Sequence, residues 1–138
     1  QLMGLASKSA NDNGQVRTIL GRICHFDLWE PTKWGVHKAL QRDEAMRKYG
    51  SNLKRAFIYK ALNKLIQGSA ADQTKKAMIE VYKAGITPHI QVHDELNCSI
   101  ETPNQAKKIK EIMENCIELE VPSKVDPKIG KSWGTIKN

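Results

Sequence analysis

The stretch Gln91-Val92-His93-Asp94-Glu95-Leu96 decides the fold and the chemistry expected of this chain. Apolar residues precede and follow an adjacent pair of acids, which predicts a β-hairpin with both carboxylates at its tip. Carboxylates held on a rigid hairpin are the oxygen ligands that Mg²⁺ prefers. An Asp-Glu pair in a turn can equally be solvated surface, so a metal site and an exposed turn are both open interpretations.

A second segment, Ala61-Leu62-Asn63-Lys64-Leu65-Ile66-Gln67-Gly68-Ser69-Ala70-Ala71-Asp72, lies upstream. At this separation the two segments together closely resemble the C-terminal palm region of family A DNA polymerases, the group of bacterial DNA polymerase I and phage replicative polymerases. In that family a Gln-Gly-(Ser/Thr)-Ala-Ala-Asp run opens the helix before the motif C hairpin, which reads Val-His-Asp-Glu. The resemblance extends back through 13–22 and forward to the Gly-x-x-Trp ending at 129–134, and it is weakest over 26–50.

The resemblance implies an α+β fold, with a polymerase palm-like small antiparallel sheet packed on helices, over residues 1–138 as a single domain or fragment. The sequence patterns alone support only an α+β domain with a small sheet. The motif A aspartate strand and the fingers helix of the family are not found in these 138 residues. We therefore expect an incomplete palm, from a processed, truncated or split polymerase.

The resemblance also implies roles for the hairpin residues. Asp94 would be the metal ligand of motif C, and Glu95 a weaker or indirect partner at the same catalytic site. The cofactor would be Mg²⁺ in a two-metal site for nucleotidyl transfer, completed by residues outside this chain. His93 would meet the primer terminus or its sugar, although a histidine satisfied by neighbouring strand residues is the alternative.

Asn63 and Gln67 are four residues apart and share one face of a helix. Amides donate and accept hydrogen bonds at once, which suits the minor-groove edges that base pairs have in common. The resemblance implies that this face contacts the primer–template, while exposed helix amides are the alternative. Where the family often carries an Arg, eight residues before the Gln, this chain has Tyr59 with Lys60 beside it.

The net charge of +7 is concentrated in one part of the chain. Between Pro31 and Lys64 there are nine basic and only two acidic residues, so the remainder is neutral by formal count. Such a block predicts a polyanion partner, with a solvated helix surface as the alternative. The candidate DNA contacts in it are Lys54, Arg55, Lys60 and Lys64.

Composition excludes some classes of protein. The chain has 27% charged residues and contains no apolar run of 18, so a membrane helix is not expected. Its three cysteines, Cys24, Cys98 and Cys116, are odd in number and lack Cys-x-x-Cys spacing. We expect free thiols in a reducing compartment, the cytoplasm of a bacterial or phage-infected cell.

Three classes of function follow. The first is a palm fragment or subunit of a DNA-directed DNA polymerase, inactive alone. Its partners would be DNA primer–template, deoxynucleoside triphosphates in the complete enzyme, and an N-terminal polymerase fragment carrying motif A and the fingers. The second is a non-catalytic DNA-binding module derived from a palm. The third is an interaction domain without a nucleic-acid role.

Local patterns predict the elements in chain order. We expect a helix end over 2–12, strands over 15–20 and 22–27, a loop over 29–35, and a helix from 50 that Gly68 interrupts. Ser69 would cap the next helix, 70–84, which Gly85 stops. Strands 90–93 and 96–100 form the hairpin, a helix begins at Thr102-Pro103, and 125–130 is a last strand. The apolar stripe expected in the core of that last helix is Ala106, Ile109, Ile112, Met113, Cys116 and Ile117.

Overall fold

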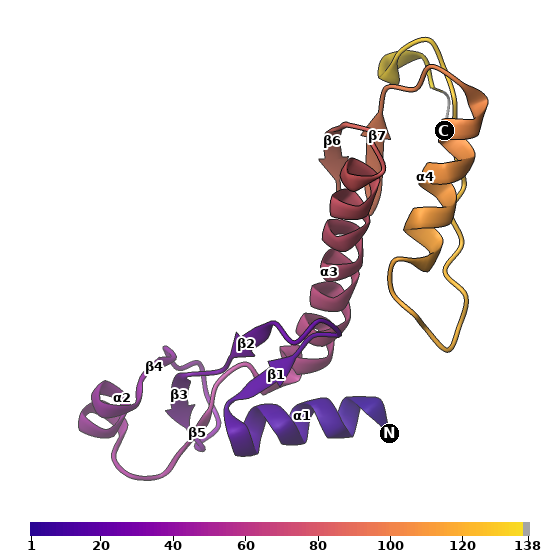
Figure 1. Cartoon of the computed structure of the whole chain (residues 1–138). Coiled ribbons are helices and arrows are strands. Elements are labelled where there is room, and N and C mark those ends of the chain that lie inside the picture. Colours follow the sequence, from indigo (N-terminus) through magenta and orange to yellow (C-terminus); the bar gives the residue numbers. More distant parts are fainter. Residues whose placement is uncertain (137–138) are drawn as a thin grey trace. The chain divides into compact units, whose positions relative to one another are not determined.

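The computed structural model describes residues 1–136 and has the α+β architecture that the sequence predicts. Short antiparallel strands form three small sheets, in place of the single sheet expected, and α-helices accompany them (Figure 1). The chain divides into two compact units, Gln1–Ser69 and Ala70–Asn138, and the boundary falls within helix α3 (Ala61–Lys83). The two units are therefore described separately.

The first unit begins with helix α1 (Leu2–Asn13), which ends at Gly14 in the left-handed conformation (φ 68°). Strands β1 (Gln15–Arg17) and β2 (Ile23–His25) then form a hairpin close to the predicted positions. The buried core of this unit joins α1 to that hairpin and to the start of α3. Its members are Ala6, Ala10, Val16, Phe26 and Ala61.

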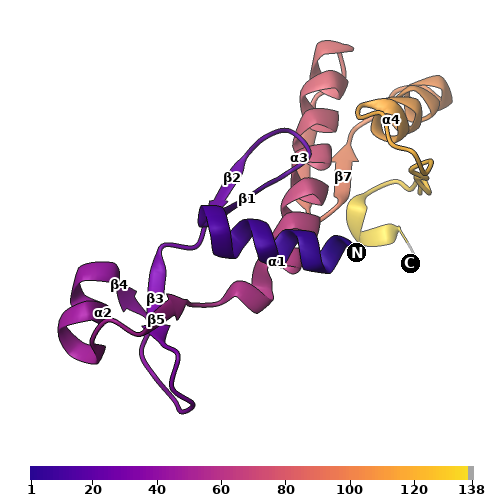
Figure 2. The same ribbon diagram turned by 90° about the horizontal axis from the view of Figure 1, so that it is seen from below.

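A three-stranded sheet occupies the middle of the first unit, in the order β4-β3-β5 (Figure 2). Its strands are β3 (Leu28–Pro31), β4 (Leu40–Gln41) and β5 (Leu53–Arg55), and helix α2 (Arg42–Tyr49) lies between β4 and β5 in sequence. The predicted loop over 29–35 is therefore wrong in its first half. Trp29 pairs with both Leu40 and Arg55, partners that local patterns cannot reveal.

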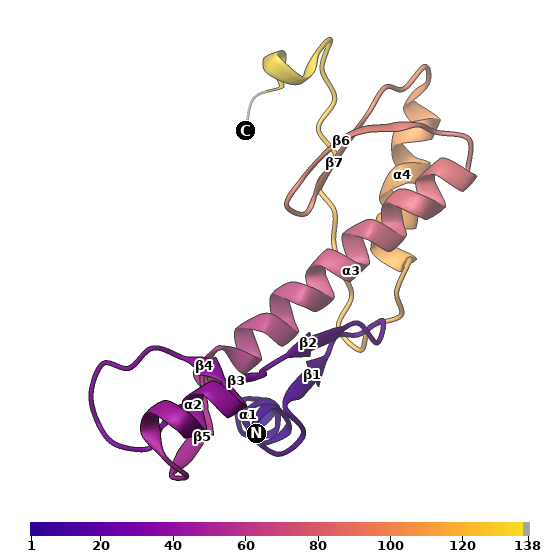
Figure 3. The same cartoon turned by 90° about the vertical axis from the view of Figure 1, so that its left-hand side faces the viewer.

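Helix α3 corrects two predictions, because it starts later than expected and runs unbroken through Gly68 (Figure 3). The residues before it form β5 and a 3-10 turn, η1 (Ile58–Lys60), so the helix does not begin at 50. Ser69 does not cap a new helix: its hydroxyl donates to the Leu65 carbonyl (2.7 Å) and accepts from the Ile19 backbone N–H (3.1 Å). Contacts with the β1–β2 connection thus hold the helix across the glycine.

The second unit contains the rest of α3, then β6 (Pro88–Val92), β7 (Glu95–Cys98), helix α4 (Pro103–Asn115) and the 3-10 turn η2 (Trp133–Thr135). Gly85 follows α3 with φ 84°, as the predicted stop requires. Two predictions are wrong here. Residues 125–130 form no strand, and of the apolar stripe on and after α4 only Ile117 is fully buried, the others being partly exposed.

Candidate metal and nucleic-acid sites

The motif hairpin is a tight two-residue turn. Val92 and Glu95 are paired across β6 and β7, so His93 and Asp94 alone make the turn. His93 has φ 53°, a left-handed conformation that such turns need and that histidine adopts more readily than most side chains. Asp94 therefore lies at the tip, as predicted, and is exposed. The prediction that both carboxylates lie at the tip is wrong for Glu95, which pairs with Val92 as the first residue of β7.

Two N–H groups hold the Glu95 carboxylate. Its Oε1 accepts a hydrogen bond from Asn97 Nδ2 (2.9 Å) and another from Trp133 Nε1 (3.2 Å). Asn97 lies two residues along the same strand, on the same face. Trp133 comes from η2 and was noticed in the sequence only as part of the Gly-x-x-Trp ending. Both donors fix the direction of the Glu95 carboxylate, next to the exposed Asp94.

The backbone of the turn is also tied down, because the Gln91 side-chain amide donates to the carbonyl of His93. A cleft of about 920 Å³ opens beside the hairpin within the second unit, lined by α3, β7, α4 and the C-terminal segment. Asp94, Glu95 and Trp133 all border this cleft. The acids thus face a concave surface large enough for a ligand.

These residues suit a Mg²⁺ ion in part. Asp94 and Glu95 offer exposed carboxylate oxygens, the ligand type that hard cations take. Within residues 1–136 the structure has no cluster of three or more His, Cys, Asp or Glu side chains that could hold a metal. The donor chemistry fits the ion, and the described residues contribute two candidate ligands to it.

The predicted amide face lies in the first unit. Asn63, Lys64 and Gln67 are all exposed on the first turns of α3. Lys60, also exposed, precedes them, and its Nζ lies over the rings of Phe57 (4.9 Å) and Tyr59 (5.6 Å). Amides and cations therefore share one accessible stretch of helix.

Two other predicted DNA contacts are engaged within the protein. The Arg55 guanidinium donates to the carbonyls of Asn11 (3.0 Å) and Phe26 (2.9 Å), and it stacks on the Trp29 ring (4.7 Å). Lys54 forms a partly exposed ion pair with Glu30 (3.4 Å). The structure thus groups His93, Asp94 and Glu95 in one unit, and the candidate DNA contacts of α3 and β5 in the other.

The cysteines are free thiols, as predicted, and all three are partly buried. Burial raises the pKa of the Cys98 thiol and, as the largest cause, that of Cys116. Helices long and apolar enough to cross a membrane are not found in the described part of the chain.

Comparison with known proteins identifies the class. The family model for DNA polymerase family A matches residues 1–135, so the chain belongs to this family. The DNA-directed DNA polymerase of Pseudomonas phage M6 is 53% identical over 78 residues, which cover 56% of this chain and 12% of the relative. DNA polymerase I of Caldicellulosiruptor bescii is 37% identical over 139 residues, covering 91% of this chain and 14% of the relative.

A solved structure agrees. The POL domain of Pol1 from M. smegmatis, in complex with DNA primer-template and dNTP, matches 97% of this chain with a TM-score of 0.70 and 29% identity. This chain covers 22% of that structure's chain. The sequence resemblance and the α+β palm-like fold are thereby confirmed, for a chain that spans a minor part of its relatives.

Proposed function

We propose that this chain is the C-terminal part of the palm of a DNA-directed DNA polymerase, a nucleotidyltransferase. One observation carries the proposal: a two-residue turn in a family A chain presents Asp94 at its tip, next to a Glu95 carboxylate that two N–H donors orient. In a turn that served only as solvated surface, a hydrogen bond from the distant Trp133 to the Glu95 carboxylate would have no purpose.

The hairpin residues have different roles in this proposal. Asp94 is the principal Mg²⁺ ligand, and Glu95, restrained by Asn97 and Trp133, is the secondary one. Mg²⁺, when bound, supplies Lewis-acid activation of the primer hydroxyl and neutralises the leaving pyrophosphate. His93 lies next to Asp94 in the turn and contacts the primer terminus.

The partners are DNA primer–template and, in the complete enzyme, deoxynucleoside triphosphates. The exposed Asn63 and Gln67 amides contact the minor groove, and Lys60 and Lys64 neutralise neighbouring phosphates. Arg55, bound to two internal carbonyls, contributes its positive charge, as does Lys54. The solved relative bound to primer-template supports DNA primer–template as the partner.

The remaining ligands and the triphosphate contacts come, in this proposal, from an N-terminal fragment carrying motif A and the fingers. The two carboxylates of one hairpin cannot alone form a two-metal site, so these 138 residues without that fragment do not extend a primer. Mg²⁺-dependent incorporation by the pure chain would contradict this part of the proposal.

The test uses a polymerase that carries this chain as its C-terminal part. Single-turnover incorporation with saturating DNA is compared for Asp94→Asn, Glu95→Gln, and Glu120→Gln as a control on an exposed acid of the same unit that does not border the cleft. Asp94→Asn removes several kcal/mol of metal-dependent stabilisation, a loss of about a thousand-fold or more, while DNA binding stays near normal. Glu95→Gln and the control should be milder.

A fourth variant, Trp133→Phe, keeps the ring and removes the N–H that Glu95 accepts. Because Trp133 is about half exposed, we expect a loss of only about five-fold, with the Mg²⁺ requirement moved to higher concentration. Near wild-type incorporation by Asp94→Asn would refute the metal assignment. It would favour instead a DNA-binding role for this chain without chemistry, or an interaction domain if the isolated chain also failed to bind DNA.

A further inference from the structure

The connection between β3 and β4, residues 32–39, carries apolar side chains that no part of the described chain covers. We call it the Trp34 loop. Trp34 and Val36 are both fully exposed. Tryptophan is among the most buried residues on average, so an indole wholly in water needs a reason.

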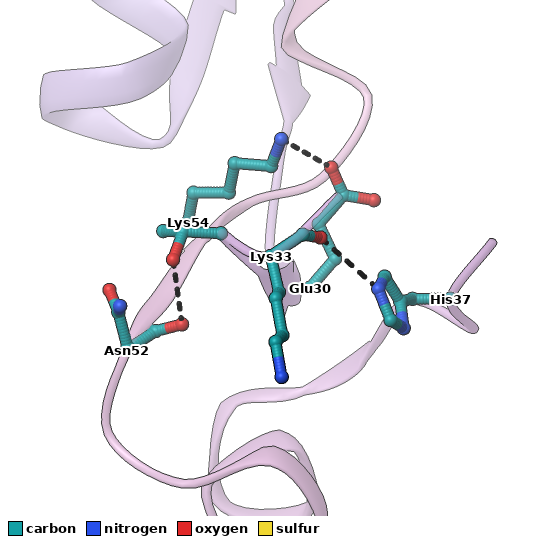
Figure 4. A network of polar contacts seen from close by, with 6 residues as sticks. Glu30, Lys33, His37, Asn52 and Lys54 are labelled. Atoms are coloured by element: carbon teal, nitrogen blue, oxygen red, sulfur yellow. Dashed lines mark hydrogen bonds and ion pairs between the residues drawn. The ribbon is translucent and has the colours of Figure 1, made fainter. Parts of the chain in front are cut away.

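The base of this loop is held in place (Figure 4). The Thr32 backbone N–H donates to the Asn52 carbonyl (3.1 Å), which anchors the first residue after β3. The His37 Nε2 lies 3.1 Å from the Lys33 carbonyl and closes the loop on itself. The side chain of Lys33 extends away from both contacts.

The second end of the loop is fastened to α2. The Tyr49 hydroxyl donates to the Lys38 carbonyl (3.2 Å). The same ring meets His37 edge-on, with 5.7 Å between ring centroids, and Lys48 Nζ lies 5.4 Å from its centre. Both ends of the loop are held by hydrogen bonds that do not involve Trp34. The loop therefore does not need the indole for its own packing, and the indole is available to bind a ligand.

Basic residues flank Trp34 in the sequence. Lys33 and Lys38 belong to the loop itself and both are exposed. Helix α2, to which the second end of the loop is hydrogen-bonded, has three basic residues and two acidic ones. They are Arg42, Arg47 and Lys48, and Asp43 and Glu44. An exposed aromatic ring among basic residues suits a polyanion that also has flat apolar faces, such as the bases of a nucleic acid. An apolar patch on a protein would offer the lysines no negative charge.

We propose that the Trp34 loop binds single-stranded DNA, with the Trp34 indole stacked on an unpaired base and Lys33 and Lys38 on the flanking phosphates. Single strands are favoured over duplex because stacking needs a base whose face is free. The inference rests on the proposed function for its occupant, the unpaired part of the template. It adds a contact in the segment 26–50, where the family motifs are least similar.

The test measures binding of the full 138-residue chain to a fluorescently labelled oligo(dT) by anisotropy, at low salt. Trp34→Ala should weaken binding by about 5- to 150-fold, with Trp34→Phe intermediate because a smaller ring still stacks. A blunt duplex should bind Trp34→Ala and parent equally. The joint variant Lys33→Ala/Lys38→Ala should lower the salt dependence of binding, since about 0.7 unit of slope is lost per phosphate contact on single strands.

Tyr82→Ala, which removes a 66% exposed aromatic from α3, is the matched control and should change nothing. Because Trp34 makes no packing contact that its loss would disturb, the urea midpoint of Trp34→Ala should equal that of the parent. Single-strand affinity unchanged in Trp34→Ala, an equal loss on duplex, or no binding by the parent chain would each overturn the proposal. These results do not involve Asp94, so failure here and failure of the polymerase assignment are distinguishable.

Discussion

Gly68 in α3 gives the sharpest test of how the first unit is packed. A Cβ built at this position lies 2.7 Å from Thr18 Cγ2, closer than real Cβ atoms come to a non-bonded atom. Thr18 has little room to move, because it is only 5% exposed and its hydroxyl accepts the Arg22 backbone N–H (3.1 Å). Arg22 also donates to the Gly68 carbonyl (2.7 Å). We therefore predict that Gly68→Ala destabilises the chain.

The size of the effect follows from two opposed contributions. Alanine is favoured over glycine inside a helix by about 0.8–1 kcal/mol. Overpacking by one methyl group against a fixed neighbour costs about 1–3 kcal/mol. The net change for Gly68→Ala is then about 0–2 kcal/mol of lost stability. Gly4 in α1 has nothing within 4 Å of its Cβ position, so Gly4→Ala should show only the gain, about 0.5–1 kcal/mol.

The measurement is urea unfolding followed by far-ultraviolet circular dichroism on both alanine variants. The difference between them isolates the close contact, because both gain a methyl group in a helix. Thr18→Ser removes Cγ2 and keeps the hydroxyl, so the double variant Thr18→Ser/Gly68→Ala should recover much of the loss. A coupling of about 0.5–3 kcal/mol is expected between residues in contact.

Two results would refute this reasoning. One is Gly68→Ala stabilising the chain as much as Gly4→Ala does. The other is a double variant whose stability change equals the sum of the single changes, which would mean that Thr18 does not meet the new methyl group. In either case the glycine would be at this position for some reason other than close packing.

Two further predictions concern single side chains. Burial raises the pKa of Cys98 and Cys116, so at pH 8 a smaller fraction of these thiols is ionised than of a free model thiol. Alkylation of the folded chain by iodoacetamide should therefore be slower than alkylation of the model thiol. The rate should increase when the pH is raised or when urea unfolds the chain. Arg55→Lys loses the planar fork that reaches two carbonyls and should cost about 1–3 kcal/mol in urea unfolding. Lys54→Ala breaks a partly exposed ion pair and should cost less than about 1 kcal/mol.

Sequence patterns predicted the elements whose signals are local. Gly85 ends α3 in the left-handed conformation that the C-terminal glycine position requires. Thr102-Pro103 begins α4, and the Gln105 side chain accepts the Thr102 backbone N–H (3.1 Å). The hairpin turn at Asp94 was also found from its neighbours alone, because a two-residue turn depends on adjacent residues.

The errors come from contacts between distant residues. Gly68 was expected to break the helix, since glycine lacks helix propensity, and the contact that compensates lies about 50 residues earlier in the chain. The strand β3 was predicted to be part of a loop because its pairing partners, β4 and β5, both come later in the sequence, after residues 32–39. At the candidate site, Asp94 and Glu95 are neighbours and were predicted together, but the Trp133 donor lies 38 residues from Glu95.

The packing of α3 and its proposed DNA contact depend on the same helical geometry. Successive residues point about 100° apart around a helix, so Gly68 against Thr18 fixes the direction of its neighbour Gln67. Gln67 and Asn63, one turn earlier, are then left exposed on one face. A methyl group at Gly68 that pushed the helix away from Thr18 would also turn that amide face. We therefore expect Gly68→Ala to weaken duplex binding in a polymerase containing this chain, and Thr18→Ser to restore binding together with stability. Binding that stayed constant while stability changed would separate the amide face from the packing of the helix.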